Sequence, residues 1–261
     1  FLASDSAAIL EYTNKMIFLE NGDFVEIDDG NFTLYDIEKN VITRDIQVID
    51  WEVSEAEKAG HDHFMYKEIL EQAEVIERTI AGRIEKNSTE IPIHLDKAKK
   101  FEKIWIVACG TAYHAGLFGK DLFEKVLGVP VSVELASEFR YREPIIGKND
   151  LAIVISQSGE TMDTIAATEL LKENGSHVLA LVNVVGSSLA RMADSVFYLH
   201  VGPEIGVAST KAYLGMLVGQ LLLAKHWDSN NKLDTSLEEI KALPSLIEEA
   251  LKCEDQVKQI S

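Results

Sequence analysis

The fold is decided by the stretch Leu151-Ala152-Ile153-Val154-Ile155-Ser156-Gln157-Ser158-Gly159-Glu160-Thr161. A run of apolar, largely β-branched residues ends at hydroxyl and amide side chains and a glycine, and helical spacing follows. This pattern predicts a strand, a turn and a helix start. The first N–H groups of a helix have no partner within it and the macrodipole is positive there, so an anion is favoured. We therefore expect a phosphate-binding turn in which Ser and Thr hydroxyls are further donors.

The same turn has a purely structural interpretation. Ser and Thr are common N-cap residues, so Ser158 or Thr161 could serve only to cap the helix that follows. Glu160 fits an anion site poorly, because its carboxylate must point away from any phosphate. The turn by itself leaves both interpretations open.

Composition bounds the class of protein. The 261 residues are 46% apolar and 26% charged, and 43 acidic against 25 basic residues give a formal charge of −18. That charge argues against nucleic acid or an anionic membrane as the main partner. No apolar run reaches the roughly 18 residues of a membrane span and no signal peptide is evident, so we expect a cytoplasmic protein. An anionic ligand must then be bound by a local arrangement of donors.

The first part of the chain predicts a small antiparallel sheet. Short apolar segments alternate with turn residues over 15–51, and the Asp28-Asp29-Gly30-Asn31 turn favours a hairpin. A short helix is expected over 6–12. From His63 to Ile84 apolar residues recur every three or four positions, which predicts one long amphipathic helix. Residues 86–96 then form a connector.

After Lys103 the pattern changes to strands that alternate with helices, which is typical of a parallel sheet covered on both faces. The expected strands are 104–108, 131–134, 151–155, 177–181 and 196–199. The expected helices are 113–127, 137–141, 161–174, 188–193, 209–227 and 236–251.

Polar clusters follow several of these strands. Cys109–Ala112 comes after the first strand, Ser156–Thr161 after the third, and Asn183–Ser188 after the fourth. Because ligands collect beyond the carboxyl ends of parallel strands, these clusters should gather along one edge. Small residues in Glu204–Lys211 would allow close backbone approach, and Ser209 or Thr210 could cap the next helix. For this last segment, capping and tight packing alone remain an equal alternative.

Other reactive residues have ordinary explanations. Cys109 follows an apolar strand, and a free Cys there is usually a small buried hydrophobe. No partnered base is evident from spacing, so we do not expect a nucleophile. His61 and His63 lack a defined third ligand, which favours a polar helix entrance over a metal site. Cys109 and Cys253 form neither a zinc pattern nor a disulfide framework.

Several motifs together resemble the first sugar isomerase (SIS) domain of the glutamine–fructose-6-phosphate aminotransferase family, the glucosamine-6-phosphate synthases. Segments near the start of the chain resemble the end of that family's glutaminase domain and its linker. The SIS motifs are Ser156–Thr161, Cys109-Gly110-Thr111-Ala112-Tyr113-His114, Glu134–Phe139, Gly186-Ser187-Ser188 and Glu204–Lys211, and the earlier segments are Phe1–Asp5, Ile49-Asp50-Trp51 and His63–Gln72.

The resemblance implies an α/β fold in which a five-stranded parallel sheet forms an αβα sandwich, preceded by the small antiparallel segment and a long linker helix. It implies a glutaminase remnant of the N-terminal nucleophile type at 1–60 and a helical linker at 61–96. The SIS domain would be 97–235, and a helical connector towards a second SIS domain would be 236–261.

The ligand implied is fructose 6-phosphate or glucosamine 6-phosphate, with no metal or organic cofactor and with a homodimer as the assembly. The residues that the resemblance places on the substrate are Thr111, Ser156, Gln157, Ser158, Thr161, Val207 and Ser209, with Cys109, Gly110, Gly159 and Lys211 as further pocket residues.

The differences between this sequence and the family pattern limit the activity that we expect of the chain. In the family the glutaminase nucleophile lies before this sequence starts, and the second SIS domain, which supplies the isomerase base, lies after it ends. We therefore expect no catalytic residue here and no half-reaction by this chain. Ala112 replaces a common serine, which removes one donor, and Ala73 replaces a common proline. The alternatives are a stand-alone SIS-type isomerase and a non-catalytic sugar-phosphate sensor.

Overall fold

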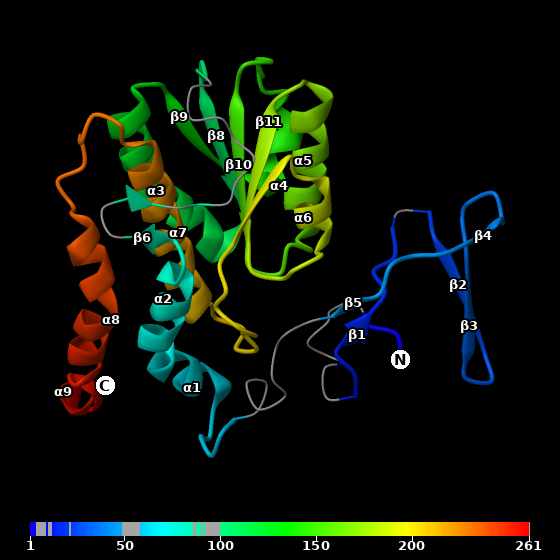
Figure 1. The fold of residues 1–261 in the computed structure, drawn as a ribbon, viewed down its shortest axis with the longest axis horizontal. Coiled ribbons are helices and arrows are strands. Elements are labelled where there is room, and N and C mark those ends of the chain that lie inside the picture. The colour runs from blue at the N-terminus through cyan, green and yellow to red at the C-terminus, as the bar shows by residue number, and fades with distance from the viewer. Residues whose placement is uncertain are drawn as a thin grey trace. The chain divides into compact units, whose positions relative to one another are not determined.

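The structure is a computed structural model that describes residues 1–3, 9, 12–20, 22–48, 58–85, 88–89, 91 and 100–260. The chain divides into two compact units, Phe1–Val53 and Ser54–Ser261. Figure 1 shows the helices and strands of both units.

The first unit contains the predicted antiparallel meander. Strands β2, β3 and β4 form a sheet in that order, and β1 pairs with β5. Asp29 and Gly30 both have positive φ, 44° and 81°, as a two-residue hairpin turn requires. The helix predicted over 6–12 falls largely outside the described residues. The strands are β1 (Lys15–Met16), β2 (Phe24–Asp28), β3 (Asn31–Tyr35), β4 (Val41–Ile42) and β5 (Gln47–Val48).

The second unit is built on a five-stranded parallel sheet with the order β12-β11-β10-β8-β9, as predicted. From β8 the chain first adds β9 on one side and then β10 on the other. The strand order therefore reverses between β8 and β10. The strands are β8 (Ile104–Ala108), β9 (Val131–Leu135), β10 (Leu151–Ser156), β11 (His177–Val182) and β12 (Ser195–Tyr198).

Helices cover both faces of this sheet (Figure 1). Most lie within three residues of their predicted bounds, and the short helix at the end of the described chain was not predicted. They are α3 (Gly110–Leu127), α4 (Ala136–Phe139) with the 3-10 turn η3 (Arg140–Arg142), α5 (Met162–Glu173), α6 (Ser188–Met192), α7 (Lys211–Trp227), α8 (Leu237–Leu251) and α9 (Glu254–Ile260).

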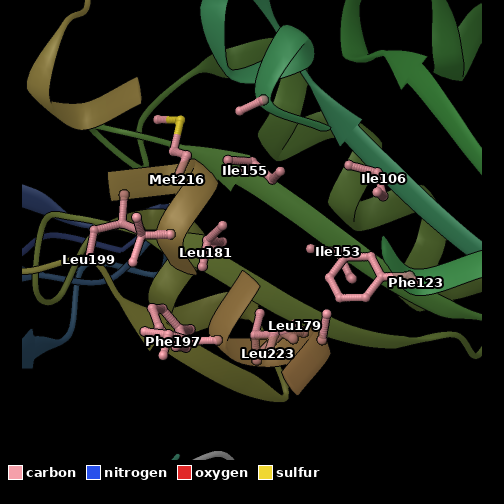
Figure 2. Packing of buried hydrophobic residues seen from close by; sticks show 14 of the residues in the cluster. Ile106, Phe123, Ile153, Ile155, Leu179, Leu181, Phe197, Leu199, Met216 and Leu223 are labelled. Atoms are coloured by element: carbon pink, nitrogen blue, oxygen red, sulfur yellow. The ribbon is translucent and has the colours of Figure 1, made fainter. Parts of the chain in front are cut away.

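The strand alternation divides the core into two apolar clusters. Ile106, Ile153 and Leu179 face α3 and α7, where they meet Phe123 and Leu223 (Figure 2). Their neighbours along the strands, such as Val107 and Val154, pack against α4 and α5 on the other face. Burial on both faces explains why these strands are continuously apolar in the sequence.

The single long helix predicted over 63–84 is wrong in extent. The segment forms α1 (Phe64–Leu70) and α2 (Gln72–Ile80), with Glu71 between them in a turn. Ala81 then takes an extended conformation, so Ile84 lies in the short strand β6 (Ile84–Glu85), paired with β7 (Ser88–Thr89). The predicted apolar face is real in α2, where Ala73 and Ile76 are buried. Periodicity found the face but not the break.

Close packing of α3 on α7 depends on Gly119. A β-carbon there would lie 1.8 Å from Oε1 of Gln220, a buried residue whose Nε2 donates to the Ala115 carbonyl at 2.8 Å. We expect Gly119→Ala to lower the free energy of unfolding by about 1–3 kcal/mol, because the helices must separate or the amide must leave its partner. Urea unfolding measures this. Asp121→Ala, at an exposed position of the same helix, should change stability by less than about 0.5 kcal/mol. Equal effects of both variants would contradict the packing argument.

Candidate functional site

Three adjacent strands bring their polar ends to one edge of the sheet. Ile155 of β10 pairs with Ala108 of β8 and with Leu181 of β11. The segments that start at Cys109, Gln157 and Asn183 therefore leave the sheet side by side. The first two flank the point where the strand order reverses, which is where open α/β sheets bind ligands.

The Ser156–Thr161 turn is organised by a buried hydroxyl. Ser156 is 3% exposed, and its Oγ accepts a hydrogen bond from the Gly159 N–H at 3.0 Å. The same Oγ lies 3.1 Å from Oγ1 of Thr161. Ser158 Oγ accepts from the Glu160 N–H at 3.1 Å. These bonds close the turn through its own side chains.

Neither hydroxyl that was considered as a cap closes α5. Thr161 is the N-cap residue but makes no side-chain cap bond, because its hydroxyl faces Ser156. Within residues 100–260, the N–H groups of Met162 and Asp163 have no protein acceptor. A helix start with unpaired donors beside hydroxyl groups is suited to bind an anion.

Glu160 is engaged by a different helix. Its Oε1 accepts from the Ser188 N–H at the start of α6 at 2.7 Å. The neighbouring Gly159 carbonyl accepts from the Leu189 N–H at 3.0 Å. The Glu160 carboxylate thus caps α6 and connects the turn after β10 to the segment after β11.

Gly159 allows this close approach. Its φ is 69°, and a β-carbon at this position would lie 2.1 Å from Ser187 Oγ. Ser187 is fully buried, and its Oγ has no partner among the described residues. A residue with a side chain therefore does not fit at position 159.

The end of β8 supplies a second helix start. Cys109 is the N-cap residue of α3 and makes no side-chain cap bond. Gly110 and Thr111 form the first turn of that helix, and Thr111 is half-buried. The Cys109 side chain packs against the apolar cluster formed with α4 and α5, as a small hydrophobe would.

The loop between β12 and α7 carries the other predicted site residues. Val207 is fully exposed, whereas Ser209 Oγ is buried without a partner in the described part of the chain. No hydrogen bond among residues 100–260 joins Val207 or Ser209 to the Ser156–Thr161 turn. Their predicted role in the site remains a prediction.

The expected capping of α7 by Ser209 or Thr210 is wrong. Glu204 caps this helix instead, because its Oε1 accepts from the N–H groups of Thr210 at 2.8 Å and Ala212 at 3.1 Å. A carboxylate at a helix start is favoured by the helix dipole. The position of Glu204, six residues before Thr210, could have indicated this cap in the sequence. The sequence favours Ser209 and Thr210 as caps because Ser and Thr are frequent at helix N-termini.

Lys211 is buried and bound to a side chain from the α1–α2 junction. Its Nζ lies 2.6 Å from Glu71 Oε2, and Lys67 Nζ lies 3.2 Å from the other oxygen. Burial alone would raise the pKa of Glu71, but Lys211 and then Lys67 outweigh it, so the pKa lies below its ordinary value. Sequence reasoning missed Glu71, because an acidic residue on an amphipathic helix is usually solvated.

Among the described residues, no group of three His, Cys, Asp or Glu side chains is arranged to hold a metal ion. No helix in the same part of the chain is long and apolar enough to cross a membrane.

Comparison with known proteins assigns the fold that carries this site. Residues 97–225 match the SIS domain family. Residues 97–225 therefore form a SIS domain, as the motifs indicated.

The whole chain is also similar to one particular enzyme type. It is 44% identical over 271 residues to the glutamine–fructose-6-phosphate aminotransferase [isomerizing] of Clostridium tetani, a match that covers 100% of this chain and 45% of the relative. A Thermus thermophilus protein of the same name is 42% identical over 96% of this chain and 43% of its own length. The chain thus spans less than half the length of these relatives.

A solved structure agrees with these relatives. The C-terminal domain of glucosamine-fructose-6-phosphate aminotransferase from Francisella tularensis matches with a TM-score of 0.71 and 38% identity, over 78% of this chain and 60% of that one. The predicted resemblance is confirmed by these comparisons.

Proposed function

We propose that this chain is the sugar-phosphate-binding part of a glutamine–fructose-6-phosphate aminotransferase and that it binds fructose 6-phosphate or glucosamine 6-phosphate. The observation that carries the proposal is the start of α5, which lies at the reversal of strand order and lacks a side-chain cap. The names of the relatives supply the substrate class.

The donors are sufficient for a metabolite. In the proposed complex the phosphate accepts from the α5 start and from the hydroxyls of Ser158 and Thr161, with Thr111 beside it. A hydrogen bond to a charged group contributes roughly 1.5–3 kcal/mol. A few such bonds account for the roughly 4–8 kcal/mol of a millimolar to micromolar ligand. Val207 and Ser209 are proposed to contact the sugar.

The chemistry of amino transfer and isomerisation is assigned to other parts of the longer protein. General acid–base catalysis needs a positioned base within hydrogen-bond reach of the substrate. Glu160 is the nearest carboxylate in the sequence, and its Oε1 is bound to Ser188 N–H. We therefore propose that this chain holds the substrate without turning it over. A homodimer, the cytoplasmic location and the domain boundaries at 60, 96 and 235 also remain proposals.

Ser158→Ala tests the phosphate turn. We expect it to weaken binding of fructose 6-phosphate roughly 10-fold, because a charge-assisted bond of about 1.5 kcal/mol is lost. An NMR titration of the chain with fructose 6-phosphate measures the affinity. Ser229→Ala, at an exposed position after α7, should bind as the wild type does.

Two results would count against the proposal. The absence of any wild-type response at millimolar ligand would exclude a sugar-phosphate site. Turnover of the sugar phosphate by the chain would instead favour a stand-alone SIS-type isomerase.

A further inference from the structure

The loop that leads into α7 is held by a buried carboxylate from α1. Glu68 is 2% exposed, and its Oε1 accepts from the N–H groups of Ile205 at 2.6 Å and Gly206 at 3.0 Å. A β-carbon on Gly206 would lie 2.5 Å from Glu68 Oε2 and 3.5 Å from Met65 Cα. The loop backbone is therefore in direct contact with α1.

A second carboxylate of the same region holds the far end of the loop. Glu71, in the turn between α1 and α2, binds the Nζ of Lys211 at 2.6 Å, where α7 begins. Lys211 is 1% exposed, so this contact is inside the unit. Glu68 and Glu71 thus fix positions on both sides of Val207–Ser209.

The near end of the loop is fixed from the sheet. Asn183, which follows β11 and is 2% exposed, accepts from the Val201 N–H at 2.9 Å and donates to the Gly202 carbonyl at 2.8 Å. Because Asn183 leaves the sheet beside Gln157, this bond relates the loop to the phosphate turn. The residues before and after Val207–Ser209 are therefore both anchored, which fixes the position of this tip of the loop.

Burying a carboxylate in the interior costs free energy. Glu68 Oε2 has no hydrogen-bond partner among the described residues, and burying such an oxygen is unfavourable. Apolar side chains of similar volume usually stabilise a fold as well as or better than buried charges. What an apolar residue cannot do is accept from two consecutive backbone N–H groups and so fix the course of a loop.

We propose that Glu68 is a positioning residue for the sugar part of the ligand, with Glu71 in support. It fixes Ile205 and Gly206 so that Val207–Ser209 stands at the sugar while the phosphate is held independently at Ser156–Thr161. This inference rests on the proposed function. It adds Glu68, which is not among the predicted ligand residues, and it separates recognition of the sugar from recognition of the phosphate.

The test compares two ligands on variants of the whole chain. Glu68→Ala removes the acceptor, Glu68→Gln keeps a neutral one, and Glu74→Ala removes a carboxylate that is 66% exposed on α2. NMR titrations with fructose 6-phosphate and with inorganic phosphate measure both affinities. Hydrogen exchange at the Ile205 and Gly206 amides reports the anchor itself.

We expect Glu68→Ala to weaken fructose 6-phosphate roughly 10-fold and Glu68→Gln roughly 3-fold, since a neutral acceptor forms weaker bonds. Inorganic phosphate should bind all variants within about 2-fold of wild type, because its donors lie on α5 and not on the loop. The two loop amides should exchange at least about 10-fold faster in Glu68→Ala, and Glu74→Ala should match the wild type throughout.

An equal loss of both ligands would overturn the inference, because it would show a general structural role. Unchanged fructose 6-phosphate binding by Glu68→Ala would overturn it as well, with the proposed function intact. A wild-type chain that binds neither ligand would overturn the proposed function and this inference together.

Discussion

Gly159→Ala is expected to unfold the Ser156–Thr161 turn and to reduce binding of fructose 6-phosphate more than any single hydroxyl deletion. The added β-carbon would lie 2.1 Å from Ser187 Oγ and 2.5 Å from Ser187 Cβ, and Ser187 is fully buried. A φ of 69° adds the penalty of a left-handed backbone. The two effects together should lower the free energy of unfolding by roughly 2–4 kcal/mol.

The consequence for binding follows from the hydrogen bonds of the turn. Moving residue 159 breaks its N–H bond to Ser156 Oγ and its carbonyl bond to the Leu189 N–H. The start of α5 then loses its fixed position, so we expect a loss of affinity larger than the roughly 10-fold expected for Ser158→Ala. Urea unfolding and an NMR titration measure the two effects.

Gly175→Ala is the matched control. Gly175 also has a positive φ, 85°. A β-carbon added at Gly175 would have Lys148 Cγ as its nearest neighbour, at 3.5 Å, which is an ordinary contact. It should lose only about 1 kcal/mol, with unchanged ligand affinity. If both alanine variants lose the same stability, the contact with Ser187 is not what requires glycine at 159.

Lys211→Met should be the second large effect. Methionine keeps most of the unbranched apolar stem of the side chain but leaves the Glu71 carboxylate with Lys67 as its remaining cationic partner. Breaking a buried ion pair usually costs about 3–5 kcal/mol. Because the Glu71 side chain is 22% exposed, we expect a loss of about 2–4 kcal/mol in the free energy of unfolding. Lys241→Met removes a half-exposed partner of Glu238 on α8 and should cost less than about 1 kcal/mol.

The difference between wild type and Lys211→Met should depend on pH. The pKa of Glu71 is lowered by Lys211 and Lys67 against the opposing effect of burial. The ion pair therefore contributes fully above the ordinary pKa of a glutamate and is lost as the pH falls through the lowered folded-state pKa. Unfolding measured at neutral pH and near pH 3 should show the difference shrink. A difference that is constant over this range would mean that Lys211 acts through packing alone.

Much of the second unit could be predicted because its strands have an unambiguous signal. Residues buried on both faces read as continuous apolar runs, and the helices between them end at recognisable caps or glycines. The Ser156–Thr161 turn could be found in the same way, since polar residues that end a buried strand need a reason to be there. Parallel pairing then put Cys109 and Asn183 beside it.

What could not be predicted are the contacts that charged residues make across the fold. Glu68 lies 137 positions before Ile205 and Glu71 lies 140 positions before Lys211, and nothing local distinguishes either from a solvated acid. The break between α1 and α2 could not be predicted for a related reason. Glu71 keeps the apolar spacing on either side intact, so periodicity continues through it.

The long helices of the second unit treat their N-termini in two ways. Carboxylates close some of them: Glu204 takes the start of α7, and Glu239 forms a capping box with Ser236 at the start of α8. At α3 and α5, Cys109 and Thr161 give no such bond. In a chain with a formal charge of −18, such internal carboxylates occupy the starts of α6, α7 and α8 and keep a dissolved anion away from them. Helix starts that are already occupied compete less for an anion, which would favour binding at the proposed site on α5.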